Sequence, residues 1–149
     1  MPARHRSRER ALQMLYQWDL TKASPRQVID AYWDALSEGE PLETATQDAF
    51  ANSLVEGVTG NIQQIDDLIV SHAANWRLER MSAVDRGILR MAVYEMLENM
   101  AMAPVVINEA IEIGRRFSGQ ESTGFLNGVL DAIRKSLENR ILVGRPSTS

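Results

Sequence analysis

Apolar residues recur along this chain at intervals of three and four positions, and no stretch alternates strictly between apolar and polar residues. Such intervals place side chains on one side of an α-helix, whereas a half-buried strand requires strict alternation. The pattern therefore predicts an all-α protein of about seven helices. The predicted helices cover approximately residues 6–20, 25–37, 42–58, 61–74, 82–99 and 104–117, and a last helix follows a turn over 118–122.

Local signals fix the start of two of these helices. Ser24 precedes Pro25 and is followed by Gln27, which is the spacing of a capping box with proline in the first helical position. Ser82 stands three residues before Asp85 and has the right side chain to cap the helix that begins after it. We expect both helices to begin at these serines.

Two glycines lie inside the predicted sixth and seventh helices, at Gly114 and Gly128. Glycine in a helix interior costs about 1 kcal/mol relative to alanine. We expect these two helices to cross closely near both glycines. The 149 residues amount to one ordinary domain, which we place at 1–143, with a basic N-terminal arm and a disordered tail over 144–149.

Charge is distributed unevenly although the net charge is only −4. Residues 1–10 contain four arginines and one glutamate, whereas residues 27–76 contain nine acidic residues and neither Lys nor Arg. Such asymmetry within one domain indicates two different surfaces. A plain solvated face is the alternative interpretation of the acidic stretch.

Several function classes find no support in the sequence. The chain has no cysteine and only two histidines, His5 and His72, and it has no glycine-rich phosphate loop. We therefore predict no enzyme activity, no metal site and no cofactor. The longest uncharged run is the ten residues 99–108, which is too short to span a membrane. The absence of cysteine fits a reducing compartment, and we expect a cytoplasmic protein.

The N-terminal arm suggests binding to a polyanion. Guanidinium groups pair with phosphates and stack on bases, and an aromatic side chain can add a stacking surface. Cations at a helix N-terminus also oppose the helix dipole, so we expect a compensating anionic partner. A solubilising helix end is the alternative. The residues concerned are Arg4, Arg6, Arg8, Arg10 and Tyr16.

A second candidate surface lies at the start of the last predicted helix. Glu121 and Ser122 supply polar groups there, and free backbone N–H groups at a helix N-terminus attract phosphate. Phe125 is nearly off the apolar stripe of that helix, so we expect it to be partly exposed and available for stacking on a base. A place in the core is the alternative for Phe125.

Four segments carry recognisable motifs: RERALQMLY at 8–16, VDRGILRMAVYEM at 84–96, INEAIEI at 107–113 and FLNGVLD at 125–131. In sequence, order and spacing they resemble the NusB family of bacterial transcription antitermination factors. The resemblance implies two packed three-helix-type bundles. It also implies binding of boxA-type single-stranded RNA together with the ribosomal protein NusE, within an RNA polymerase antitermination complex that supports transcription of ribosomal RNA operons.

The same resemblance implies roles for individual residues. Asp85 would belong to the side that faces NusE. This sequence departs from the family pattern at Gly124, where a basic residue is common, at Gln64, where some relatives carry an aromatic residue, and at Glu121, where aspartate is common. At or near the RNA would lie Arg4, Arg6, Arg8, Arg10, Tyr16, Arg90, Glu121, Ser122 and Phe125.

Two other functions stay open at this point. The chain could be a purely protein-binding helical adaptor that uses the acidic surface of residues 27–76. It could also be a stand-alone relative of the RNA-methyltransferase-associated domain of the same fold, which a chain ending at Ser149 disfavours. A homodimer is possible on this sequence, which does not decide between monomer and dimer.

Overall fold

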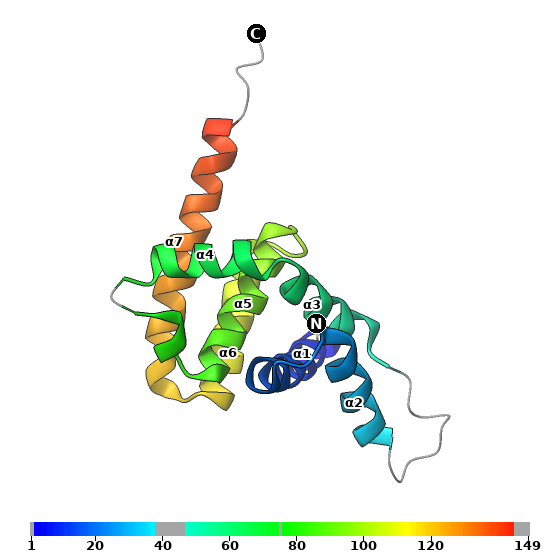
Figure 1. Cartoon of the computed structure of the whole chain (residues 1–149). Coiled ribbons are helices and arrows are strands. Elements are labelled where there is room, and N and C mark those ends of the chain that lie inside the picture. Colours follow the sequence, from blue (N-terminus) through cyan, green and yellow to red (C-terminus); the bar gives the residue numbers. More distant parts are fainter. Residues whose placement is uncertain (1, 38–46, 75, 145–149) are drawn as a thin grey trace.

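The computed structural model describes residues 2–37, 47–74 and 76–144, and every regular element in these ranges is helical (Figure 1). The predicted all-α class is therefore confirmed. The helices are α1 (Pro2–Thr21), α2 (Pro25–Ser37), α3 (Ala49–Gly60), α4 (Ile62–His72), the 3-10 turn η2 (Leu78–Arg80), α5 (Ala83–Leu97), α6 (Ala103–Phe117) and α7 (Gln120–Gly144).

Both predicted helix starts are confirmed by hydrogen bonds. The Gln27 backbone N–H donates to the Ser24 hydroxyl at 3.2 Å, and the Ser24 N–H donates to the Gln27 side-chain oxygen at 3.1 Å. These two bonds complete the capping box of α2. At the start of α5, the Asp85 N–H donates to the Ser82 hydroxyl at 3.0 Å.

Other helix bounds differ from the prediction. Helix α1 begins at Pro2, so the arginine-rich arm is part of the helix. Helix α3 begins only at Ala49, because the Asp48 side chain accepts a hydrogen bond from the Ala51 N–H and caps the helix there; the predicted start at residue 42 lies outside the described residues. The turn η2 was not predicted.

The last helix is also longer than predicted at both ends. Helix α7 begins at Gln120, so it takes up part of the predicted turn over 118–122. It runs to Gly144, the first residue of the predicted disordered tail, while residues 145–149 lie outside the described part. Figure 1 shows its C-terminal half projecting beyond the other helices. Neither α7 nor any other helix in the described ranges is long and apolar enough to cross a membrane.

Helix α5 is the centre of the molecule. It packs against α1 and α3 on one side and against α4, α6 and α7 on the other. Helices α1 to α3 form the N-terminal bundle, and α5 to α7 form the second, which α4 crosses (Figure 1). One continuous apolar core joins the two bundles. Its fully buried large side chains are Met14, Leu15, Ile29, Leu54, Ile65, Ile69, Ile88, Leu89, Met91, Ile113, Leu126 and Leu130.

The predicted close crossing of α6 and α7 is confirmed at one of the two glycines. A Cβ atom on Gly114 would lie 2.5 Å from the Leu126 side chain of α7. A Cβ atom on Gly128 would meet nothing within 4 Å, so the prediction is wrong at that position. Two other close approaches were not predicted: Gly57 of α3 lies against the ring of Tyr94 on α5, and Gly87 of α5 lies against the Leu12 side chain of α1.

Candidate nucleic-acid interface

The arginines of α1 divide into buried and exposed groups. Arg8 is only 5% exposed, because it lies on the side of α1 that packs on α5. Its Nε and one terminal nitrogen donate to the Glu95 carboxylate at 2.9 and 2.7 Å. Burial lowers the pKa of Arg8, but the hydrogen bond and the charge of Glu95 outweigh it and leave the pKa raised. This corrects the expectation that Arg8 presents its charge at the surface.

Arg90 of α5 is buried in the same way. Its guanidinium donates to both carboxylate oxygens of Asp66 on α4, at 2.9 and 3.0 Å, and lies 3.5 Å from a carboxylate oxygen of Asp19 on α1. The ring of Trp18 covers it at 5.7 Å. Arg90 therefore joins α5 to α1 and α4, and its expected place at the RNA surface is corrected as well.

Arg4 and Arg10 lie along the edge of α1 that faces α3. The Arg4 guanidinium stands 3.8 Å above the ring of Phe50. Arg10 donates to the Asp48 carboxylate at 2.9 Å, and Ser7 donates to the same carboxylate oxygen at 2.6 Å. These two arginines remain partly accessible, but each already has a partner within the protein.

The compensating anionic partner that we expected for α1 is internal. Glu95, Glu109 and Asp48 all approach the first turns of the helix. Burial raises the pKa of Asp48, but the hydrogen bonds from Ser7, the Ala51 backbone and Arg10 outweigh burial and lower it overall. The dipole argument from the sequence therefore does not call for an external polyanion.

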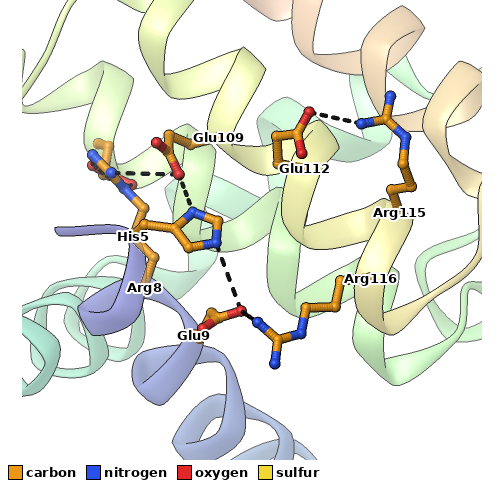
Figure 2. A network of polar contacts seen from close by, with 8 residues as sticks. His5, Arg8, Glu9, Glu109, Glu112, Arg115 and Arg116 are labelled. Carbon is orange, nitrogen blue, oxygen red and sulfur yellow. Dashed lines mark hydrogen bonds and ion pairs between the residues drawn. The ribbon is translucent and has the colours of Figure 1, made fainter. Parts of the chain in front are cut away.

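The outward face of α1 carries Arg6 and Tyr16. Arg6 is exposed and has no ion pair with any residue in the described part of the chain. Tyr16 is 38% exposed. Between them along the helix, the Glu9 carboxylate accepts from Arg116 of α6 at 2.8 Å. His5, one turn earlier, contacts Glu109 of α6 at 2.5 Å, so α1 is tied to α6 at two points (Figure 2).

The corner between α6 and α7 is held by Asp85. Its carboxylate accepts a hydrogen bond from Ser118 at 2.5 Å and another from Ser122 at 3.0 Å, and the two serine hydroxyls lie 2.8 Å apart. The side chains of Asp85 and Ser122 are thus already engaged with each other. Glu121, in the first turn of α7, is exposed.

An aromatic pair lies one turn further along α7. Phe125 is half-buried and packs against the core on one side. Its ring lies 5.3 Å from that of Trp76, at an interplanar angle of 56°. Trp76, between α4 and η2, is 53% exposed, and sequence reasoning missed it. A large aromatic residue in a polar segment between helices was the available signal.

A series of side-chain contacts connects α1 to the end of α6, and the end of α6 to the start of α7. Glu9 and Arg116 join α1 to the end of α6, Ser118 and Ser122 join α6 to α7, and Phe125 on α7 then meets Trp76. The outward face of α1 and the start of α7 are therefore linked through the end of α6. We call this surface the α1–α6–α7 surface.

Two departures from the family pattern also lie at the surface. Gly124 is exposed at the start of α7, and a Cβ atom there would meet nothing within 4 Å. Gln64 is exposed on α4. A larger side chain at position 124 would therefore meet no steric obstacle. At position 64 the glutamine side chain is already exposed.

Known proteins resemble this chain over most of its length. The sequence model of the NusB family matches residues 5–135. The transcription antitermination protein NusB of Solibacter usitatus (strain Ellin6076) is 48% identical over 137 residues, which are 92% of each chain. The structure of T. maritima NusB aligns with a TM-score of 0.71 and 34% identity, over 89% of this chain and 90% of that one.

A third similarity is to a complex. The crystal structure of the antitermination factors NusB and NusE with double-stranded RNA contains a chain that aligns with a TM-score of 0.76 and 26% identity. The alignment covers 91% of this chain and 98% of that one. The family match includes nearly all of α1 and the whole α6–α7 corner, so it extends over the α1–α6–α7 surface.

Proposed function

Because this chain belongs to the NusB family, we propose that it is a non-enzymatic transcription antitermination factor that binds boxA-type single-stranded RNA together with the ribosomal protein NusE. In this proposal it joins an RNA polymerase antitermination complex and supports transcription of ribosomal RNA operons. The name of its curated relatives supports the antitermination role, and the complex of NusB and NusE with double-stranded RNA supports RNA and NusE as partners.

The observation that carries the proposal is the linked α1–α6–α7 surface. On α1 this surface carries the exposed ring of Tyr16 and the Glu9 carboxylate that links α1 to the end of α6, and Arg6 is exposed on the outward side of the same helix. Phosphates bind to guanidinium groups, and unpaired bases stack on aromatic rings. We leave Arg8 and Arg90 out of the binding surface, because their guanidinium groups are buried against carboxylates.

The same surface favours a single strand over a duplex. Bases can stack on Tyr16, Phe125 and Trp76 only when they are splayed out of a helix. The first turn of α7 adds backbone N–H groups at the positive end of the helix dipole, which attracts phosphate. Glu121 and Ser122 lie in that turn and would position the strand.

Arg4 and Arg10 have a secondary place in the proposal. Both lie at the α3 edge of α1 and have internal partners. Their positive charge would attract the RNA from a distance, without close contacts to it. For Asp85, whose carboxylate holds the α6–α7 corner, we propose that it shapes the side presented to NusE.

A titration with labelled RNA tests the proposal. We expect the full chain to bind a single-stranded boxA oligonucleotide more tightly than a scrambled one or a boxA duplex, and more tightly still when NusE is added. Equal binding to boxA and to the scrambled strand, with and without NusE, would exclude the proposal. Binding of NusE combined with no binding of any of these RNAs would favour the protein-binding adaptor.

The salt dependence of binding tests the role of α1. Each phosphate contact on a single strand contributes about 0.7 to the slope of log K against log salt. Arg6→Ala should therefore lower the slope by about that amount. Arg26→Ala removes the same charge from an exposed position on α2 and is the matched control. An unchanged slope for Arg6→Ala would show that Arg6 does not contact a phosphate and would remove it from the interface.

Oligomeric state is measured in the same samples. Sedimentation of the free chain and of its RNA complex decides between monomer and homodimer, which the proposal leaves open. In reconstituted transcription with RNA polymerase, NusE and a boxA template, we expect the chain to increase read-through of a terminator. No increase there would leave RNA binding intact but would contradict the antitermination role.

A further inference from the structure

The last turn of α6 carries two neighbouring arginines that point in different directions (Figure 2). Arg115 donates to Glu112 of its own helix at 2.7 Å. Arg116 reaches away from its helix and donates to the Glu9 carboxylate of α1 at 2.8 Å. The two residues thus have the same charge and helix but different surroundings, and only Arg116 lies on the α1–α6–α7 surface.

Arg116 also lies beside an exposed aromatic ring. Its guanidinium carbon is 5.2 Å from the centre of the Phe117 ring. The Arg116 side chain is 66% exposed and Phe117 is 39% exposed. A large apolar residue with this exposure at a helix end adds little to the core, so the two side chains are available to a ligand.

We propose that Arg116 and Phe117 form a nucleotide-binding subsite between α1 and the start of α7. The guanidinium binds one phosphate and the Phe117 ring stacks on the adjacent base. This inference rests on the proposed binding of single-stranded RNA and adds to it a subsite at the end of α6. This subsite would lie between Tyr16 on α1 and Phe125 on α7 and would bind the part of the strand that passes between them.

The contact with Glu9 is compatible with this role. A guanidinium has five N–H donors, and the single hydrogen bond to Glu9 leaves others for a phosphate. Glu9 thus holds Arg116 toward α1, and Tyr16 stands two helical turns further along the same side of α1. On the other side, Ser118 follows Phe117 directly and connects to Ser122 of α7.

A purely structural role would give different results. Cations in the last turn of a helix interact favourably with the helix dipole, and exposed ion pairs contribute little to stability. If Arg116 served only these purposes, its loss would slightly lower the melting temperature and leave RNA binding unchanged. Stability and RNA affinity therefore separate the two roles.

The test compares Arg116→Gln with Arg115→Gln, which remove the same charge from adjacent residues. With a boxA oligonucleotide, we expect Arg116→Gln to weaken binding roughly fivefold or more and to lower the salt slope by about 0.7. Arg115→Gln should change the affinity less than about twofold. Equal losses in both variants would reduce the effect to overall charge and overturn the subsite.

A second variant addresses the ring. Phe117→Leu keeps an apolar side chain but removes the aromatic face, and we expect roughly fivefold weaker binding with an unchanged melting temperature. Should Phe117→Leu fail to fold, 4-thiouridine crosslinking of boxA RNA to the unaltered chain gives an independent measurement. Crosslinks in the peptide that contains Arg116 and Phe117 support the subsite, and their absence overturns it.

The experiments distinguish an incorrect subsite from an incorrect proposed function. Preference of the unaltered chain for boxA, with Arg116→Gln and Phe117→Leu binding normally, overturns only the subsite. No preference for boxA overturns both. A change in sedimentation instead of RNA affinity in these variants would assign the end of α6 to contacts between copies of the chain and would also overturn the subsite.

Discussion

The guanidinium of Arg8 and the carboxylate of Glu95 form a two-point ion pair between α1 and the centre of α5, with nitrogen–oxygen distances of 2.7 and 2.9 Å. Both side chains are almost completely buried. A third group, Glu109 of α6, lies 4.0 Å from the same guanidinium. An arginine that the sequence placed among RNA ligands therefore connects the two bundles of the fold.

Breaking this pair should strongly destabilise the protein. Glu95→Gln leaves the Arg8 charge buried without its partner, and we expect the free energy of unfolding to fall by about 3–5 kcal/mol. Urea unfolding followed by circular dichroism measures the loss. Arg6→Met, on the exposed face of α1, should stay within about 0.5 kcal/mol of the unaltered chain.

The double variant Arg8→Met with Glu95→Leu sharpens this prediction. It removes both charges and fills the space with apolar groups, so it should be more stable than Glu95→Gln alone. If Glu95→Gln lowers the free energy of unfolding by less than about 1 kcal/mol, water reaches the Arg8–Glu95 pair and its burial does not govern stability.

Asp48 should make stability depend on pH in the acid range. The pKa of its carboxyl is lowered in the folded protein from an ordinary value of 3.8. The carboxylate therefore stabilises the fold above pH 3.8, and this contribution is lost as the pH falls from 3.8 through the lower folded-state value.

Asp48→Asn tests the pH dependence while its amide oxygen can still cap α3. At neutral pH we expect a loss of about 1 kcal/mol, because the charge opposite Arg10 is removed. The difference from the unaltered chain should shrink as the pH is lowered below 4. Asp34→Asn, at an exposed position on α2, is the control of equal charge. A difference that stays constant with pH would contradict the assignment.

The Trp76–Phe125 pair should bind RNA as a unit. Stacking contributes about 1–3 kcal/mol per base, so we expect Phe125→Ala to weaken boxA binding at least roughly tenfold. Trp76→Ala should have a similar effect with little loss of stability, because Trp76 is 53% exposed. The melting temperature of each variant is measured alongside its RNA affinity. If Phe125→Ala melts well below the unaltered chain, Phe125 belongs to the core.

A basic side chain at position 124 should improve RNA binding. The position is exposed, lies one residue before Phe125 and has free space for a side chain. Gly124→Lys should raise the salt slope by about 0.7 and raise helix stability by roughly 0.5–1 kcal/mol. Gly60→Lys adds the same charge at the end of α3, where space is also free. Equal gains in both variants would show a nonspecific charge effect.

The sequence by itself determined the helices and several of their ends. Periodicity of apolar residues and capping residues act within a few positions, so the capping box at Ser24 and the cap at Ser82 could be predicted without any tertiary information. The close packing at Gly114 followed from the cost of glycine inside a helix, but the same argument failed at Gly128, which has open space around it, so this local signal does not decide by itself where helices cross closely. Four segments were also enough to indicate the family.

Only the tertiary structure decided which of the arginines are available. Arg8 and Arg6 are two positions apart on α1, yet one is buried and the other exposed. The carboxylate that binds Arg8 lies 87 positions away, and the one that binds Arg10 lies 38 positions away. Trp76 and Phe125 likewise meet only because α4 and α7 pack against α5 and against each other. The local sequence pattern predicts which residues share one face of a helix. The side chains that bury or pair with that face come from distant parts of the chain.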